Sequence, residues 1–259
     1  MASLGRLVDK VALVTGASSG IGAGTAILFS QLGARVIITG RNEENLEKTA
    51  EQCNHDKYKP VLLTGDLSKE EDTKRIVEEA IAATGRLDIL INNAGILESG
   101  SIETTSLEQF DRTFSINVRS IYHLTMLCVP HLVKTKGNIV NVSSIAGVRA
   151  FPGILSYCMS KSAIDQMTRC VALELAPKQV RVNCVNPGVI VTEVHKRGGM
   201  TEEKYAQFLE RCKTTHALGR VGEVREVANV IAFLASDSAS FITGNTESID
   251  GGRHCMCPR

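Results

Sequence analysis

The chain has 259 residues, of which 43% are hydrophobic, and its formal net charge is +1. Because this charge is close to zero, neither a nucleic acid nor an anionic membrane surface is expected as a partner. The sequence also lacks an apolar run of the ~18 residues needed to cross a membrane and an apolar N-terminal secretion signal, so a cytoplasmic protein is expected.

The first predicted strand, residues 10–15, runs directly into a glycine-rich turn. Glycines let the backbone approach a pyrophosphate, and the N–H groups at the start of the following helix then face its negative charge. The spacing departs from the GxGxxG dinucleotide fingerprint, so a turn that only needs glycine is an alternative. The residues of this turn expected to contact a dinucleotide are Gly16, Ser18, Ser19, Gly20, Ile21 and Gly22.

The second predicted strand, residues 35–39, is followed by Gly40, Arg41 and Asn42. A site selective for NAD commonly carries an acidic residue here, about 20 positions after the glycine turn. A guanidinium can instead pair with the extra phosphate of NADP. We therefore predict NADP(H) as the cofactor, with NAD less favoured, and Arg41 and Asn42 as contacts. Alternatively, Arg41 only caps the strand or faces solvent.

Four further apolar runs alternate with helix-length segments; they cover residues 61–64, 88–91, 137–142 and 180–185. One intervening helix is predicted to open with a capping box at residues 68–71. The alternation, without a linker or a repeat, predicts a doubly wound α/β fold: a parallel sheet with helices on both faces. The ligand crevice of such a sheet lies beyond the carboxyl ends of its strands, where Gly16, Asn92 and Ser144 are expected.

Tyr157 and Lys161 lie four positions apart, which places a phenol and an ammonium on the same face of a helical turn. A free tyrosine titrates near pH ~10, so a phenol that transfers protons near neutrality needs its anion stabilised by about 4 kcal/mol. A neighbouring cation supplies such stabilisation. The spacing also occurs by accident in helices, so the pair gains its meaning from the other motifs.

These motifs together resemble those of the short-chain dehydrogenase/reductase family. The TGxxxGxG turn appears at residues 15–22, an Asn-Asn-Ala-Gly run at residues 92–95, and the YxxxK element at residues 157–161. A serine upstream of the tyrosine matches Ser144, and an asparagine matches Asn117. The resemblance extends from about Lys10 to Gly252. It implies a Rossmann fold of about seven strands that forms one dinucleotide-binding catalytic domain over residues 1–259.

The resemblance implies hydride transfer between the nicotinamide C4 and a carbonyl carbon. Tyr157 is implied to be the general acid/base, with Ser144 hydrogen-bonded to the same substrate oxygen. Lys161 is implied to hold the nicotinamide ribose and to lower the pKa of the phenol, and Asn117, inside a helix, to maintain a water link from Lys161 to solvent. Taken singly, these residues could also be a buried hydrogen-bonding asparagine, a capping serine and a surface lysine.

The resemblance also implies further contacts to the cofactor: Asp66, Leu67, Asn93, Ala94, Gly95, Tyr157, Lys161, Pro187, Gly188, Val189, Ile190 and Thr192. Asp66 could instead only start a helix. Residues 193–220 are predicted to form a substrate lid, with a hinge at Gly198 and Gly199. Lys196 and Arg197 in this lid could meet an anionic substrate or simply be solvated.

The chain is similar to 3-oxoacyl carrier-protein reductases and to carbonyl or hydroxysteroid reductases, so the expected substrate is a small-molecule ketone or alcohol. Family members usually assemble as homodimers or homotetramers, and the same is expected here. One alternative is a catalytically idle NADP(H)-binding protein that regulates a partner. Another is an isomerase or lyase on the same scaffold, because a fold does not fix its chemistry.

Eight cysteines are scattered along the chain, mostly in apolar segments, and are expected to be reduced thiols. Residues 254–257 hold a histidine and two cysteines but lack the distant second pair of a structural zinc site, so no metal is expected. The other histidines, among them His195 and His216, are expected to be isolated.

Overall fold

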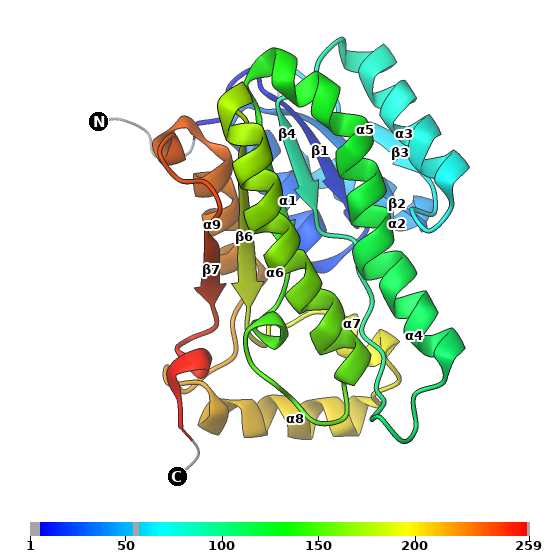
Figure 1. The fold of residues 1–259 in the computed structure, drawn as a ribbon, viewed down its shortest axis with the longest axis vertical. Helices are drawn as coiled ribbons and strands as arrows, with labels where there is room; N and C mark the ends of the chain where they lie inside the picture. The colour runs from blue at the N-terminus through cyan, green and yellow to red at the C-terminus, as the bar shows by residue number, and fades with distance from the viewer. Residues whose placement is uncertain (1–5, 54–56, 258–259) are drawn as a thin grey trace.

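The computed structural model describes residues 6–53 and 57–257, and its centre is a parallel sheet of seven strands (Figure 1). The strand order is β3-β2-β1-β4-β5-β6-β7, and every neighbouring pair is parallel. The strands are β1 (Val11–Thr15), β2 (Arg35–Gly40), β3 (Val61–Thr64), β4 (Ile89–Asn92), β5 (Asn138–Val142), β6 (Arg181–Pro187) and β7 (Thr246–Ile249).

Helices cover both faces of the sheet (Figure 1). One face carries α1 (Gly20–Gln31), α2 (Glu43–Gln52) and α9 (Val224–Ala235). The other face carries α3 (Glu70–Thr84), α5 (Ser120–Thr135) and α6 (Leu155–Leu175). The remaining helical segments are α4 (Leu107–Phe114), a π-helical turn (Ser115–Arg119), α7 (Val194–Arg197), α8 (Glu202–Thr215) and the 3-10 turns Ile145–Gly147, Ala176–Lys178, Asp237–Ala239 and Arg253–Cys255.

The strands are apolar along their whole length because both of their faces are covered. Successive side chains of a strand point to opposite faces. In β1, Ala12 and Val14 belong to the core that contains Phe29 of α1, whereas Val11 and Leu13 belong to the core that contains Leu124 of α5. A continuous apolar run, rather than an alternating one, is therefore what this architecture requires.

The order of the strands fixes where a ligand can bind. β1 pairs with both β2 and β4, so the sheet grows in one direction through β2 and β3 and in the other through β4 to β7. The crevice of a doubly wound sheet lies at this reversal, beyond the carboxyl ends of the strands. In Figure 1 the arrowheads of β6 and β7 point toward α8, which crosses below this edge.

The predicted fold class is confirmed, and the six predicted strands differ from the observed ones by at most two residues at either end. The predicted capping box is wrong. Helix α3 begins at Glu70 after Lys69, and the Ser68 hydroxyl donates to Asp66 Oδ1 (2.8 Å) rather than accepting a helix N–H. The Asp66 carboxylate, only two residues away, therefore holds the serine that the capping box would need.

Across residues 6–53 and 57–257, no helix is long and apolar enough to cross a bilayer, and no three His, Cys, Asp or Glu side chains group as a metal site. All eight cysteines are free thiols, of which Cys53, Cys128, Cys184 and Cys212 are buried.

Candidate active site

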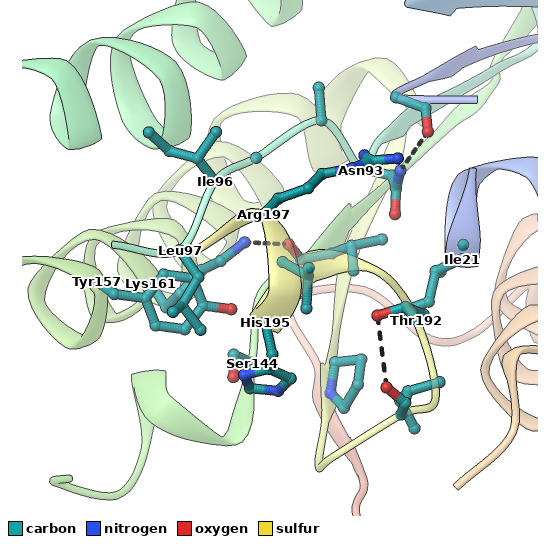
Figure 2. Close-up of a pocket in the computed structure, with 18 of the residues that line it drawn as sticks. Ile21, Asn93, Ile96, Leu97, Ser144, Tyr157, Lys161, Thr192, His195 and Arg197 are labelled. Carbon is teal, nitrogen blue, oxygen red and sulfur yellow. Dashed lines mark hydrogen bonds between the residues drawn. The ribbon is translucent and has the colours of Figure 1, made fainter. Parts of the chain in front are cut away.

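A pocket of about 680 Å³ opens at the carboxyl ends of the strands. Its lining comes from the glycine turn, from the segments after β2, β3, β4, β5 and β6, and from α6, α7, α8 and the turn after β7. Figure 2 shows Tyr157, Lys161 and Ser144 on one side of this pocket and Ile21 and Thr192 on the other.

The glycine turn packs closely against the segment after β4. Gly16 and Gly20 have φ values of +63° and +56°, a region that favours glycine. A Cβ on Gly22 would lie 2.4 Å from both Asn93 Nδ2 and Gly16 O. Glycine is therefore required at all three positions, and Gly22 serves packing behind the pocket rather than lining it.

Hydrogen bonds hold this turn and the segment after β4 in fixed relation. Thr15 Oγ1 donates to Ile91 O (3.1 Å) and accepts from the N–H groups of Asn93 (2.9 Å) and Ala94 (3.1 Å). Asn93 Nδ2 donates back to Thr15 O (2.9 Å). Asn93, Ala94 and Gly95, which were predicted to contact the cofactor, thereby line the pocket.

Helix α1 begins at the pocket with its first N–H groups uncapped. Its N-cap residue, Ser19, makes no side-chain hydrogen bond to the helix, and Ser19, Gly20 and Ile21 line the pocket. The first N–H groups of a helix carry partial positive charge and bind phosphate groups readily. This end of the pocket therefore fits the pyrophosphate of a dinucleotide.

The predicted residues after β2 and β3 divide into two groups. Arg41 is exposed, lines the pocket and forms no ion pair with any residue that the structure describes. Asp66 and Leu67 also line it. Asn42 lies outside the lining, because its side chain caps α2 by accepting from Asn45 N (2.8 Å).

Tyr157 lies in the first turn of α6 and lines the pocket together with Ser144. Burial raises the pKa of Tyr157 to about 12, and a hydrogen bond with Ser144 opposes this rise. The phenol of the protein by itself is thus less acidic than a free tyrosine. The pKa is raised because loss of hydration outweighs the hydrogen bond from Ser144, and the expected action of Lys161 on this pKa stays a prediction.

Lys161 is buried beside the phenol, with its Nζ 5.6 Å from the centre of the Tyr157 ring. The ammonium donates to Val142 O (2.9 Å) and faces the backbone of Gly95. Burial lowers its pKa to about 8, while the charge of Asp165 acts in the opposite direction. Lys161 is therefore protonated at neutral pH but can lose its proton in mildly basic solution.

Asn117 lies behind the pocket, in the π-helical turn between α4 and α5. Its Oδ1 accepts from Ile96 N (2.8 Å), and its Nδ2 donates to Ile96 O (2.9 Å) and Ser160 Oγ (3.1 Å). The side chain therefore joins the segment after β4 to α6, which carries Tyr157 and Lys161. π-Helical turns often occur at functional sites.

The segment after β6 forms the next wall. The five residues predicted there as cofactor contacts line the pocket: Pro187, Gly188, Val189, Ile190 and Thr192. Two residues from the following region hold this wall in place. The ring of His216, which is buried, accepts from Val189 N (3.3 Å) through Nε2, and the Tyr205 hydroxyl donates to Thr192 O (3.1 Å).

A buried polar network supports the catalytic side from behind. Asn186 Nδ2 donates to Ser144 O (3.0 Å) and to the Asp165 carboxylate (3.0 Å), and Cys184 Sγ donates to the same carboxylate (3.5 Å). All of these residues are buried. Asp165 was not among the residues predicted from the sequence, although its position one helical turn after Lys161 is a signal that could have identified it.

At the opposite end of the pocket the sequence predicted only the lid of residues 193–220 and not the other lining residues. This end lies between the loop before α6 and the region of α7 and α8, and we call it the substrate end. Its lining residues are Leu97, Phe151, Ile154, His195, Arg197, Phe208, Arg211 and Arg253. His195 packs 4.7 Å from the ring of Phe208, and burial together with the charge of Arg253 lowers its pKa.

Of the predicted site residues, all line this one pocket except Gly22, Asn42 and Asn117. Gly22 and Asn117 act through packing and hydrogen bonds to lining segments, whereas Asn42 caps α2. The chain therefore offers a helix N-terminus for a pyrophosphate, a phenol and a hydroxyl side by side, and a buried ammonium next to them.

Known proteins share this arrangement over nearly the whole chain. A family described as Enoyl-(Acyl carrier protein) reductase matches residues 16–254. The 3-oxoacyl-[acyl-carrier-protein] reductase FabG of Thermotoga maritima is 39% identical, with 95% of this chain and 98% of that protein covered. The L-xylulose reductase of Caenorhabditis elegans is 37% identical over 94% of this chain and 95% of that protein.

A solved structure gives the same result. The crystal structure of a short-chain dehydrogenase/reductase of unknown function from Caenorhabditis elegans, with cofactor, has a TM-score of 0.92 and 34% identity, with 97% of each chain covered. The names of the relatives agree on a reductase but differ in substrate, since one names an acyl carrier protein and the other a sugar.

Proposed function

The chain belongs to the short-chain dehydrogenase/reductase family, whose members act on alcohol and carbonyl groups, and from this premise we propose that it reduces a ketone with NADPH. The observation that carries the proposal is the placement of Tyr157 beside Ser144 and Lys161, in the same pocket as the uncapped start of α1.

Tyr157 acts as the general acid in this proposal. Burial raises its pKa to about 12, so the phenol holds its proton at neutral pH, and it gives this proton to the oxygen of a ketone where the phenolate is stabilised. Ser144, which lies within hydrogen-bonding reach of the phenol, donates to the same oxygen and orients it. A nicotinamide bound in this pocket would supply the hydride for the carbonyl carbon.

Lys161 and Asn117 support Tyr157 in this proposal, the first through its charge and the second through hydrogen bonds. The ammonium of Lys161 stabilises the phenolate that remains after proton transfer, since a cation in a buried site acts strongly on a nearby anion. Lys161 also binds the ribose hydroxyls of the nicotinamide half. Asn117 fixes the segment after β4 against α6, so that the two walls keep their spacing.

The proposed cofactor is NADP(H), held by the predicted lining residues from Gly16 to Thr192. Arg41 carries this preference, because its guanidinium lines the pocket at the end of β2 and has no carboxylate partner among the described residues. The phosphate on the adenosine ribose of NADP(H) would give Arg41 an anionic partner.

Three further predictions belong to this proposal. Residues 193–220, which contain α7 and α8, form a lid over the substrate end. The protein assembles as a homodimer or homotetramer. A cytoplasmic location remains a prediction from the sequence.

The proposal is tested by the consumption of NADPH in the presence of 3-oxoacyl thioesters, ketosteroids, quinones and small diketones. For a ketone that is turned over, Tyr157→Phe should lower kcat by about 100-fold or more, because the acid is removed while the ring remains. The dissociation constant of NADPH should stay within about twofold of the original value. A variant that keeps its full rate would exclude Tyr157 as the acid.

A further inference from the structure

We propose that the substrate end binds the oxyanion of an anionic ketone, a carboxylate or a phosphate, through Arg253 and Arg211. This inference rests on the proposed function, because it names the class of ketone that the same site reduces. It depends on the positions of the two guanidinium groups in the lining, on the partial burial of Arg253 beside the exposed Arg211, and on the absence of a carboxylate paired with either group in the described part of the chain.

Arg253 stands on a fixed turn directly after β7. The side chain of Asp250, which is 2% exposed, accepts from Gly252 N (3.0 Å), from His254 N (2.6 Å) and from His254 Nδ1 (2.9 Å). Arg149 also donates to His254 O (2.8 Å). The backbone on both sides of Arg253 is therefore held, so its side chain is presented to the pocket by a rigid support.

The guanidinium of Arg253 is partly removed from water. Its Cζ lies 4.8 Å from the centre of the Phe151 ring, and both residues line the pocket. Burial lowers the pKa of Arg253, the positive charge of Arg211 lowers it further, and Cys212 and Asp250 oppose this. An arginine nevertheless keeps its charge near neutral pH, so two neighbouring cations face one cavity.

Neither cation is neutralised by a carboxylate in the described part of the chain. No ion pair there involves Arg253, Arg211 or Arg197. The acidic residues at this end are already used: Glu98 pairs with Arg112 (2.9 Å), and Glu193 pairs with Lys196 (3.4 Å). The Asp250 carboxylate already accepts hydrogen bonds from Gly252 and His254 within its own turn.

The two basic residues of the predicted lid, Lys196 and Arg197, differ in whether they reach the pocket. Lys196, which the sequence offered as a contact for an anionic substrate, pairs with Glu193 and Glu202 and is not part of the lining. Arg197 does line the pocket.

A partly desolvated cation without an anionic partner is unfavourable, and a ligand anion would remove this cost for Arg253 through charge-assisted hydrogen bonds. Apolar side chains line the rest of this end, among them Leu97, Ile154 and Phe208. The substrate class is therefore a ketone whose apolar body joins the carbonyl group to a terminal oxyanion.

The test compares each anionic ketone with its neutral ester. The full chain is assayed with NADPH and either levulinate or para-acetylbenzoate, and with the methyl ester of each. Acetoacetyl-coenzyme A serves as the phosphate-bearing ketone. Arg253→Leu and Arg211→Leu are the test variants, Arg253→Lys keeps the charge, and Arg225→Leu, exposed on α9 outside the pocket, is the matched control.

We expect kcat/KM for the acids, or for the coenzyme A thioester, to be about tenfold or more higher than for the methyl esters. The reason is that a partly buried charge pair contributes binding energy of this size. Arg253→Leu and Arg211→Leu should each remove most of this preference while changing kcat/KM for the esters less than about threefold. Arg253→Lys should retain part of it, and Arg225→Leu all of it. The member of the panel with the highest kcat/KM distinguishes a carboxylate from a phosphate.

Binding is measured separately, from the rise in Tm caused by benzoate or phenyl phosphate compared with benzyl alcohol. A larger rise with an anion, lost in Arg211→Leu, supports the inference even if no ketone in the panel is reduced, in which case the proposed function fails alone. Turnover of acids and esters at equal kcat/KM, with no rise in Tm from either anion, overturns the inference and leaves the proposed function intact.

Discussion

At the scale of single residues, the sequence spacing of Tyr157 and Lys161 predicts that they lie together, but it does not predict their pKa values. Their positions in the sequence correctly place both groups in one site, but spacing does not reveal burial. Burial favours the neutral form of each group. It raises the pKa of the phenol to about 12 and lowers the pKa of the ammonium to about 8. The phenol therefore holds its proton at neutral pH, and it gives that proton up readily only where the phenolate is stabilised.

The pH dependence of reduction follows from Lys161. A lysine is charged below its pKa, so the cation is present below about pH 8 and is lost as the pH rises through that value. The kcat/KM for a neutral ketone should be constant at lower pH and fall about tenfold per pH unit above it. Lys161→Arg keeps a charge over the whole range, so this decline should be absent from its profile. A wild-type profile that stays level up to pH ~10 would contradict the role given to Lys161.

Arg41 decides the choice of cofactor at the same scale. Arg41→Ala should weaken NADPH binding by about tenfold or more, because a charge-assisted pair with the extra phosphate is lost, and should change NADH binding by less than about twofold. Titration of both nucleotides by fluorescence measures this. Arg225→Ala, an exposed arginine outside the pocket, is the control. Equal affinities for the two nucleotides in the unmodified protein would rule out the preference.

At the scale of elements, the strand, turn and helix from β1 to α1 behave as one packed unit with the segment after β4. The sequence predicted this unit well because its apolar runs and glycines are local signals. It predicted residues 193–220, which contain α7 and α8, as a substrate lid, but it did not predict that the turn after β7 joins them in lining the pocket. His195, Arg211 and Arg253 come from different segments, and only tertiary packing brings them together.

Gly22 tests the packing of that unit. In Gly22→Ala the new Cβ would fall 2.4 Å from Asn93 Nδ2 and Gly16 O, so the turn must move. We expect a loss of about 1–3 kcal/mol in the free energy of unfolding and a loss of NADPH binding of about tenfold or more. Gly85→Ala, in open space at the end of α3, should cost about 1 kcal/mol through its positive φ and leave NADPH binding unchanged. Urea unfolding and nucleotide titration of both variants distinguish the two effects.

At the scale of the whole molecule, the parallel sheet with helices on both faces and the edge that holds the crevice were predictable, because alternating strands and helices permit few topologies. Assembly was predictable only by resemblance. The structure adds that α5 and α6 expose apolar side chains: Tyr122 is 61% exposed, Met126 53% and Leu173 78%. Such side chains on adjoining helices suit an interface between copies.

Sedimentation of the purified protein tests this assembly. The unmodified chain, of 27.9 kDa, should sediment as a dimer or tetramer, and Met126→Lys combined with Leu173→Lys should shift it toward the monomer, because two charges would have to be buried. Phe241→Lys, at a fully exposed position outside α5 and α6, should leave the mass unchanged. If the unmodified protein sediments as a monomer, the prediction is wrong.

The turn that presents Arg253 has a consequence for how such an enzyme diversifies. It follows β7, an edge strand that pairs only with β6, whereas the glycine turn grows from β1 in the middle of the sheet. Exchanges in residues 250–257 can therefore alter which compounds are accepted without disturbing the central strands. Substrate range and nucleotide use are thus free to evolve at separate rates, and a library randomised over this short stretch is a direct route to enzymes with new preferences.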